Sequence, residues 1–241
     1  MTGAGNPLTL IEHYDGAAWS IVSSPNTSDV DYDTLAGVSC TNANDCWAVG
    51  YYSDATSTHT LTEHYSVPVQ LNAVVSRKTH GVAGAFDVDL TSGSGIECRS
   101  GGANGDYTIV FAFANTLTTV GGANVTSGAG SVVSNNIDSS DTHNYIVNLT
   151  GVTNAQRITV SLTNVTDLVG NFSSTVSATM GALLGDVNAS GRVDAADVSS
   201  VRQQTLQTID FSNFRNDINV SGRIDAADVS VARQQTLTAL P

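Results

Sequence analysis

The chain has 241 residues, with 22 acidic and 9 basic side chains and a formal net charge of −13 at pH 7. A surface of this sign repels a phosphate backbone, so nucleic acid is excluded as a partner class. No run of about 18 apolar residues is present, and we therefore expect no membrane span.

The same composition is typical of an exported protein. Lys78 is the one lysine, and Thr, Ser, Asn, Gly and Val are abundant. Long helical periodicity is absent before the C-terminal tail, which favours an all-β body. The start "MTGAGNPLTL" has neither the basic residues nor the apolar core of a signal peptide. We therefore expect a fragment of a longer extracellular or cell-surface protein.

Residues 1–67 contain a short repeat. The sequence "TLIEHYDG" from Thr9 returns as "TLTEHYSV" from Thr60, 51 residues later. A period of about 40–50 residues with short strands is typical of propeller blades. The stretch from "GAAWSIV" through "CTNANDCWAVGYY" to "LTEHY" resembles a bacterial propeller-type repeat, so we expect a partial blade. His13 and His64 recur in it; a packing role is favoured over metal binding.

Three cysteines are present, at positions 40, 46 and 98. Cys40 and Cys46 are separated by the turn-type sequence "TNAND", and a disulfide across a hairpin is expected in an oxidising compartment. Cys98 is left over and is predicted to be a free or weakly buried thiol.

Residues 68–180 alternate between apolar and polar side chains. The segments "YTIVFAF" from Tyr107, "YIVNL" from Tyr145 and "ITVSL" from Ile158 each place their large side chains on one face. Strands of this length between Gly, Ser and Asn turns predict a two-sheet sandwich. The ending "LTNVTDLVGNFSSTVSATM" resembles bacterial Ig-like domains, which implies a fold and no chemistry.

The catalytic candidates in this region are weak. Cys98 with His80 or His143 would form a nucleophile pair, but the surrounding "IECRSGGANGDY" carries no nucleophile signature. Glu97 and Asp106 would form a glycosidase pair, and we instead expect solvated carboxylates in a glycine-rich turn. No catalytic residue is therefore predicted.

The C-terminal tail contains a near-exact duplication. "GDVNASGRVDAADVSSVRQQTL" starts at Gly185 and "NDINVSGRIDAADVSVARQQTL" starts at Asn216, with 16 of 22 positions identical. Each copy places oxygen groups at positions 1, 3, 5, 7, 9 and 12 of a loop with glycine at position 6, which suits a hard cation that takes about six to eight oxygens. The alternative is a pair of helix-capping turns. The candidate ligands are Asp186, Asn188, Ser190, Arg192, Asp194 and Asp197, then Asp217, Asn219, Ser221, Arg223, Asp225 and Asp228, where each arginine contributes its backbone carbonyl. The aliphatic residues at position 8, Val193 and Ile224, are expected to pair the two loops.

The two loops, each followed by a short helix, resemble a type I dockerin. Position 12 is Asp where the common calcium loop has Glu, and alanines stand at positions 10 and 11 where many members have hydroxyl residues. The resemblance implies two bound Ca²⁺ ions and docking to a cohesin-type domain. It implies partner contacts by Ala195, Ala196, Arg202 and Gln203 in the first copy and Ala226, Ala227, Arg233 and Gln234 in the second.

The expected fold class is mostly β, with a partial propeller-like repeat at 1–67, an Ig-like sandwich at 68–180 and a small α-helical calcium-loop (dockerin, F-hand) domain at 181–241. The expected function is that of a secreted, noncatalytic modular protein with the sandwich as a spacer. Two alternatives stay open: a carbohydrate-binding module with a polysaccharide partner, and the C-terminal fragment of a dockerin-bearing glycoside hydrolase.

Overall fold

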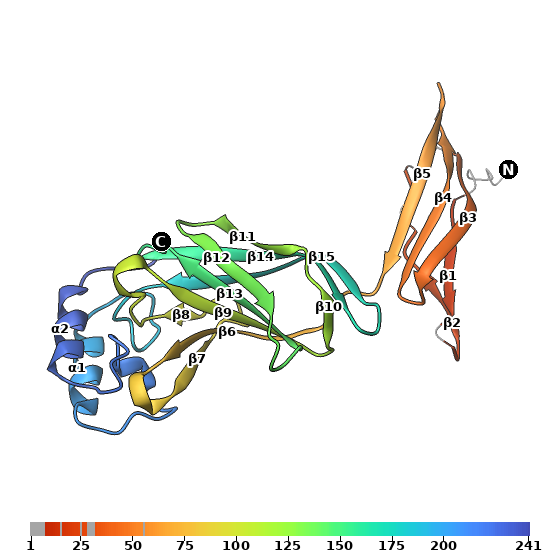
Figure 1. Ribbon diagram of the computed structural model, residues 1–241. Coiled ribbons are helices and arrows are strands. Elements are labelled where there is room, and N and C mark those ends of the chain that lie inside the picture. The colour runs from red at the N-terminus through yellow and green to blue at the C-terminus, as the bar shows by residue number, and fades with distance from the viewer. Residues whose placement is uncertain (1–7, 15, 25, 28–31, 55) are drawn as a thin grey trace. The chain divides into compact units, whose positions relative to one another are not determined.

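The computed structural model describes residues 8–14, 16–24, 26, 27, 32–54 and 56–241. The chain divides into two compact units: Met1–Val69 with Thr166–Ser173, and Gln70–Val165 with Ser174–Pro241. Strands make up most of the regular structure, and two helices lie near the C-terminus, which confirms the predicted mostly β fold class (Figure 1). Among the described helices, none has the length and apolar character needed to cross a membrane.

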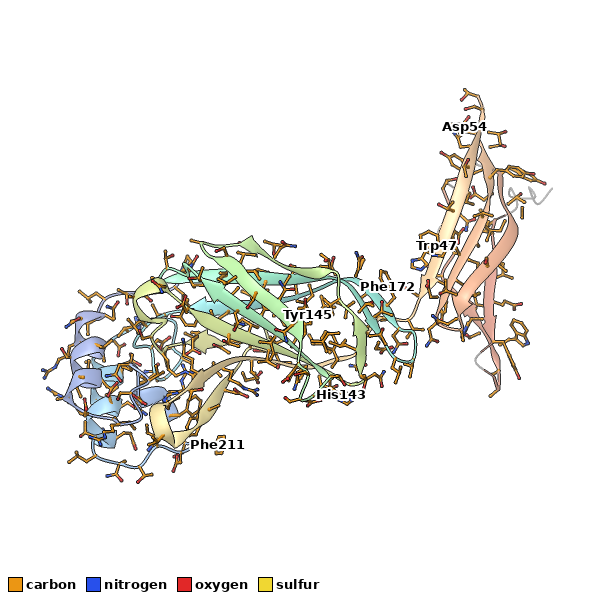
Figure 2. The ribbon with its side chains drawn as sticks, in the orientation of Figure 1. Trp47, Asp54, His143, Tyr145, Phe172 and Phe211 are labelled. Atoms are coloured by element: carbon orange, nitrogen blue, oxygen red, sulfur yellow. A yellow bond between two sulfur atoms is a disulfide. The ribbon has the colours of Figure 1, made fainter. Side chains whose placement is uncertain are left out.

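The first unit is built from antiparallel strands. A hairpin joins β1 (Ile11–Tyr14) to β2 (Trp19–Val22), and a sheet follows in the order β3 (Tyr32–Asn42), β4 (Asp45–Ser53), β5 (Thr58–Ser66). Ala48 and Leu61 are buried on one face of this sheet, and Trp47 and Tyr51 are exposed on the other (Trp47 is labelled in Figure 2). The relation of this short sheet to a propeller blade stays a prediction.

The cysteine predictions are confirmed. A disulfide joins Cys40 to Cys46, which face each other across β3 and β4. Cys98 is a free thiol and is fully buried, so it is more enclosed than the sequence suggested.

The two repeated histidines make packing and hydrogen-bonding contacts. His13 has its ring nitrogen Nε2 3.0 Å from the carbonyl of Ala43. His64 bonds Asp45 through Nε2 at 2.7 Å and stacks on Trp47 with 4.1 Å between the ring centroids. These contacts agree with the favoured packing role.

The second unit begins with two five-stranded sheets (Figure 1). The likeness of this pair of sheets to an Ig-like sandwich stays a prediction. One has the order β12-β13-β9-β6-β7; the other has the order β10-β14-β15-β8, with β11 also pairing to β14. The strands are β6 (Leu71–Thr79), β7 (Ala85–Asp89), β8 (Ile96–Glu97), β9 (Tyr107–Phe113), β10 (Leu117–Thr119), β11 (Gly122–Ser127), β12 (Ser131–Ile137), β13 (Asn144–Thr150), β14 (Gln156–Asp167) and β15 (Phe172–Ala182). We refer to residues 70–182 of this unit as the sandwich.

The side chains that alternate in the sequence form the core of the sandwich. Phe111, Val147 and Leu162 are fully buried, and Tyr145, labelled in Figure 2, is 3% exposed. Burial of a large apolar side chain contributes about 1.5–3 kcal/mol, so these alternating positions account for much of the stability of the sheets.

One carboxylate in this core contradicts the sequence prediction. Glu97 was expected in a solvated turn, but its side chain is fully buried on β8. Arg99 donates to both of its oxygens, from Nε at 2.8 Å and from Nη2 at 2.7 Å, and Ser76 donates its hydroxyl at 2.6 Å. Burial acts to raise the pKa of Glu97, but the charge and hydrogen bonds of Arg99 hold it below its usual value. The predicted solvation fails because Ser76 on β6 and Arg99, two residues along the chain, together enclose the carboxylate. Asp106, in contrast, is exposed.

The C-terminal module, which we define as residues 183–241, continues directly from β15. The amides of Leu183 and Gly185 bond to the carbonyls of Glu97 and Cys98 at 3.0 and 2.9 Å. The parallel pairing of β15 with β8 thus extends to the residue before Asp186. The sandwich and the C-terminal module therefore belong to one compact unit.

Two helices follow the duplicated loops. They are α1 (Ala195–Gln204) and α2 (Ala226–Gln234), with the one-turn 3₁₀ helix η3 (Phe214–Asn216) between them. The side chain of Asp194 accepts a hydrogen bond from the amide of Ala196, and the side chain of Asp197 accepts one from the amide of Asp194, which completes a capping box. Asp225 begins α2 in the same way.

The position-8 residues do not pair with each other, contrary to the prediction. Val193 exchanges backbone hydrogen bonds with the segment after α2, from Leu237 at 3.0 Å and to Thr238 at 2.9 Å. Ile224 accepts a bond from Leu206, after α1, at 3.0 Å. Each loop is therefore tied to the segment that follows the other copy's helix.

The buried Glu97–Arg99 pair generates a stability prediction. Arg99→Met leaves a buried carboxylate without its partner and should destabilise the sandwich by about 3–5 kcal/mol. The matched control is Arg77→Met, because Arg77 pairs with Asp87 at the surface and should cost under about 1 kcal/mol. Hydrogen exchange of the β6 and β9 amides measures the loss of stability in each of the two variants. Equal costs would contradict the role given to the buried pair.

Candidate calcium loops and docking surface

The position-1 carboxylate organises each loop. Asp186 is fully buried, and its Oδ1 and Oδ2 accept hydrogen bonds from the amides of Ser190 and Gly191 at 2.9 and 2.8 Å. Asp217 makes the same two bonds in the second loop, at 3.0 and 2.8 Å. Gly191 has a φ of +86°, a conformation that a side chain disfavours, so glycine is required for this turn. Positions 5 and 6 are thereby folded back over position 1.

The position-12 carboxylate closes the loop from the helix side. Asp197 is fully buried, with Oδ1 accepting the amide of Asn188 at 3.2 Å and Oδ2 accepting the amide of Asp194 at 2.9 Å. Asp228 repeats this arrangement in the second loop at 3.1 and 2.9 Å. The first turn of each helix is thus fixed to the start of its loop.

The remaining oxygen groups lie between these two carboxylates. The Ser190 hydroxyl is 2.9 Å from the backbone oxygen of Arg192 and 3.5 Å from Oδ1 of Asp186, and its amide bonds Oδ1 of Asn188 at 2.9 Å. Ser221 makes the equivalent contacts in the second loop. The structure therefore gathers positions 1, 3, 5 and 7 and closes the loop with position 12.

Position 9 lies apart from that group, because Asp194 and Asp225 direct a carboxylate oxygen at their own helix N-termini. Among the described residues, no three His, Cys, Asp or Glu side chains form a metal-binding group. Much of each loop's oxygen set belongs to Asn, Ser and backbone carbonyl groups, which are ligands of calcium.

The electrostatics of the loops fit a bound cation. Burial raises the pKa of Asp186, and the charge of Asp197 raises it further, against the opposing effect of the backbone hydrogen bonds. The pKa of Asp228 is raised by burial and by the charges of Asp217 and Asp225. Negative charge that is buried and close together is stabilised by a divalent cation, and all the groups here are hard oxygen donors.

The eight predicted partner-binding residues are all exposed. Ala195 and Ala226 begin their helices, and a groove brings Arg202 of the first copy together with Ala226 and Arg233 of the second. This groove therefore combines residues of both copies, whereas the sequence suggested one face for each.

Two further exposed residues were missed in the sequence. Leu206 and Leu237 occupy equivalent positions after α1 and α2, are 91% and 97% exposed and have φ values of +68° and +75°. A leucine in the left-handed region is uncommon. The signal available in the sequence was that both copies end in "RQQTL".

The comparisons agree with this geometry. Residues 184–235 match the family model for the dockerin type I domain. The segment includes both loops and both helices, so the predicted resemblance is confirmed there. No curated protein and no solved structure matches the chain. Type I dockerins are calcium-binding, noncatalytic docking modules whose partners are cohesin domains, and they occur in extracellular and cell-surface proteins.

The catalytic candidates do not assemble. His80 bonds Asp217 and Arg99, and His143 lies at the surface, where it bonds Asp141 (Figure 2). Burial raises the pKa of the Cys98 thiol to about 11, opposite to the shift that a nucleophile requires.

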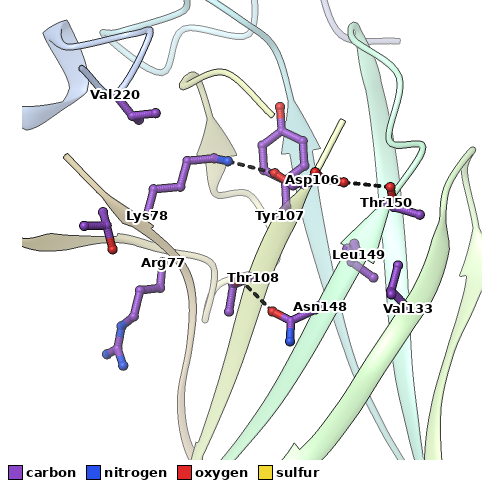
Figure 3. A pocket seen from close by; sticks show the side chains of 11 residues that line it. Arg77, Lys78, Asp106, Tyr107, Thr108, Val133, Asn148, Leu149, Thr150 and Val220 are labelled. Atoms are coloured by element: carbon purple, nitrogen blue, oxygen red, sulfur yellow. Dashed lines mark hydrogen bonds between the residues drawn. The ribbon is translucent and has the colours of Figure 1, made fainter. Parts of the chain in front are cut away.

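A hollow on the sandwich surface is the place to look for a glycan site, which the alternative of a carbohydrate-binding module requires (Figure 3). Its aromatic residue, Tyr107, is 9% exposed, and the Lys78 ammonium lies 4.1 Å above the ring. Lys78 donates to the backbone oxygen of Asp106, and Thr150 donates to the Asp106 side chain. The ring and several polar groups are thus already engaged within the protein, and nothing here favours a glycan over the docking function.

The Cys98 thiol yields a reactivity prediction. The native chain should show no alkylation by iodoacetamide at pH 8, and the chain unfolded in guanidinium should gain one label. Because the folded-state pKa is raised, the unfolded state deprotonates first, and stability should fall as pH rises from about 8.5 towards 11. Mass spectrometry counts the labels. Rapid labelling of the native chain would disprove the burial of this thiol.

Proposed function

We propose that this is a secreted, noncatalytic modular protein whose C-terminal dockerin binds two calcium ions and docks to a cohesin-type receptor, with the sandwich as a spacer. The observation that carries the proposal is the pair of loops with the same hydrogen bonds and the same order of oxygen groups. Capping turns alone do not require an inward carboxylate at both ends of a loop. The extracellular location follows from the class of module and from the Cys40–Cys46 disulfide.

Calcium would be held by the oxygen groups of each loop. When bound, the ion supplies positive charge among buried carboxylates and links the start of the loop to the helix. The proposed ligands are Asp186, Asn188, Ser190, Arg192, Asp194 and Asp197 in the first loop and Asp217, Asn219, Ser221, Arg223, Asp225 and Asp228 in the second. The arginines contribute backbone carbonyls.

Docking would use the exposed side of the two helices. Arg202 and Arg233 line one groove, and the alanines at positions 10 and 11 leave room for a partner side chain. Leu206 and Leu237 add exposed apolar area at the two ends. This surface suits a partner with an apolar centre and acidic groups around it, since Arg and large apolar side chains are frequent anchors of interfaces. The proposed partner contacts are Ala195, Ala196, Arg202, Gln203, Ala226, Ala227, Arg233 and Gln234, together with the two leucines.

The calcium-binding prediction is tested on the full chain by titration calorimetry. We expect two bound ions, and each should stabilise the fold by about 2.7 kcal/mol at a hundredfold excess over its dissociation constant. Replacing Asp186 and Asp217 with alanine should abolish both the calcium binding and the stabilisation, because each loop then lacks its position-1 carboxylate. The control is Asp210→Ala, an exposed carboxylate outside the loops. Calcium binding that survives the double substitution would refute the proposed ligands.

The docking prediction uses the two exposed leucines. Because Leu206 and Leu237 occupy equivalent positions in the two copies, we expect a partner to bind in two orientations that exchange them, and losing one orientation should weaken binding by only about twofold. Leu206→Glu or Leu237→Glu alone should have this small effect. The double variant should lose at least about thirtyfold, as for a hot-spot residue of about 2 kcal/mol. Calorimetry with cohesins from the genome that encodes this chain measures the affinity of each variant, with Val133→Glu as the control.

Val133 is an exposed side chain on β12 of the sandwich, so its substitution tests the effect of an added charge away from the helices. Equal and additive losses from the two leucine variants would exclude interchangeable orientations. No loss in the double variant would exclude these leucines from the interface.

A further inference from the structure

The two calcium loops differ in one contact from the sandwich. His80 and Asp217 are both fully buried, and His80 Nδ1 lies 2.8 Å from Oδ2 of Asp217, although 137 residues separate them. Asp186, the equivalent residue of the first loop, receives no side-chain hydrogen bond from the sandwich among the described residues. The near-identical loops therefore have different surroundings.

Arg99 determines which nitrogen of His80 carries the hydrogen. Arg99 Nη1 lies 3.0 Å from His80 Nε2, and a guanidinium group donates hydrogen bonds but does not accept them. Nε2 is therefore the acceptor, and Nδ1 donates its hydrogen to the Asp217 carboxylate. Arg99 is itself held by Glu97 and by the backbone carbonyl of Phe86 at 2.8 Å. The imidazole is thus fixed in orientation and in tautomer.

The backbone of the second loop also rests on the sandwich. The amide of Ser100 donates to the carbonyl of Ile218 at 2.7 Å. Gly81 lies so close that a Cβ atom there would be 2.6 Å from the carbonyl oxygen of Ser221. Phe86 stacks on Phe214, just before the loop, with 5.3 Å between the ring centroids. The loop is therefore packed against the sandwich along its first half.

We propose that His80 is a positioning residue for the second calcium site. It holds Oδ2 of Asp217 together with the amide of Gly222, which leaves Oδ1 beside Ser221 for the ion. Hydrogen bonds that orient a ligand commonly change metal affinity by about 10–100-fold. The second site thus depends on a side-chain hydrogen bond from the sandwich, and among the described residues the position-1 carboxylate of the first site has no such bond. This inference rests on the proposed binding of calcium by both loops.

The test separates the two bonds of His80 by two substitutions. In His80→Asn the amide nitrogen lies as many bonds from Cβ as Nδ1, so the donor to Asp217 is kept. In His80→Gln the amide group reaches the position of Nε2 instead, so the acceptor for Arg99 is kept and the donor to Asp217 is displaced. Each is combined with Asp197→Ala, which leaves only the second site, or with Asp228→Ala, which leaves only the first.

Calcium affinity of these full-length variants is measured by calorimetry, and amide NMR spectra check the fold. We expect His80→Gln to weaken the second site about 10–100-fold and the first site less than about twofold, and we expect His80→Asn to retain most of the second site's affinity. An equal loss in the Asn and Gln variants, or an equal loss at both sites, would overturn the positioning role. Full affinity in both variants would also overturn it. Absence of calcium binding in the unsubstituted chain would instead refute the proposed function on which it rests.

Discussion

The C-terminal module depends on the compensation of buried negative charge. Asp186, Asp197, Asp217 and Asp228 are fully buried, and burial raises the pKa values of Asp186 and Asp228. Backbone amides provide several hydrogen bonds to these carboxylates but no full positive charge. A small module with two short helices buries little apolar surface with which to offset the repulsion. A cation in each loop, as proposed, would offset this charge, and the helices that carry the proposed docking residues start from those loops.

The sandwich contributes to this module more than a spacer requires. Pairing between β15 and β8 continues to the edge of the first loop, and the chain from Glu97 through Arg99 and His80 ends on a carboxylate of the second. The exposed sides of α1 and α2 remain free. The sandwich therefore contacts the second loop and the residues that precede the first, while the proposed docking residues on the two helices stay exposed.

The repeated motif made the site predictable because its signal is local. The loop is defined by twelve consecutive residues, so spacing alone predicted the oxygen groups and the glycine turn. The sheets followed from alternation, and the Cys40–Cys46 bridge followed from a five-residue separation across a hairpin. These features depend on residues that are close in the sequence.

The features that were missed depend on distant residues. Glu97 was predicted to be solvated because its glycine-rich neighbours suggest a turn, but the distant Ser76 on β6 encloses it together with Arg99, which lies two residues away. His80 could not be matched with Asp217 across 137 residues. The pairing of Val193 with the segment after α2 depends on how the two copies pack. Tertiary packing determines each of these contacts, and no pattern in the neighbouring sequence predicts it.

The most direct test of the account is the binding of the full chain to cohesin domains from the same genome, measured by surface plasmon resonance in calcium and after a chelator is added. The account predicts saturable binding in calcium, loss of binding in chelator, and recovery when calcium is restored. Binding that is equal in calcium and in chelator would contradict the claim that the calcium loops organise the docking surface.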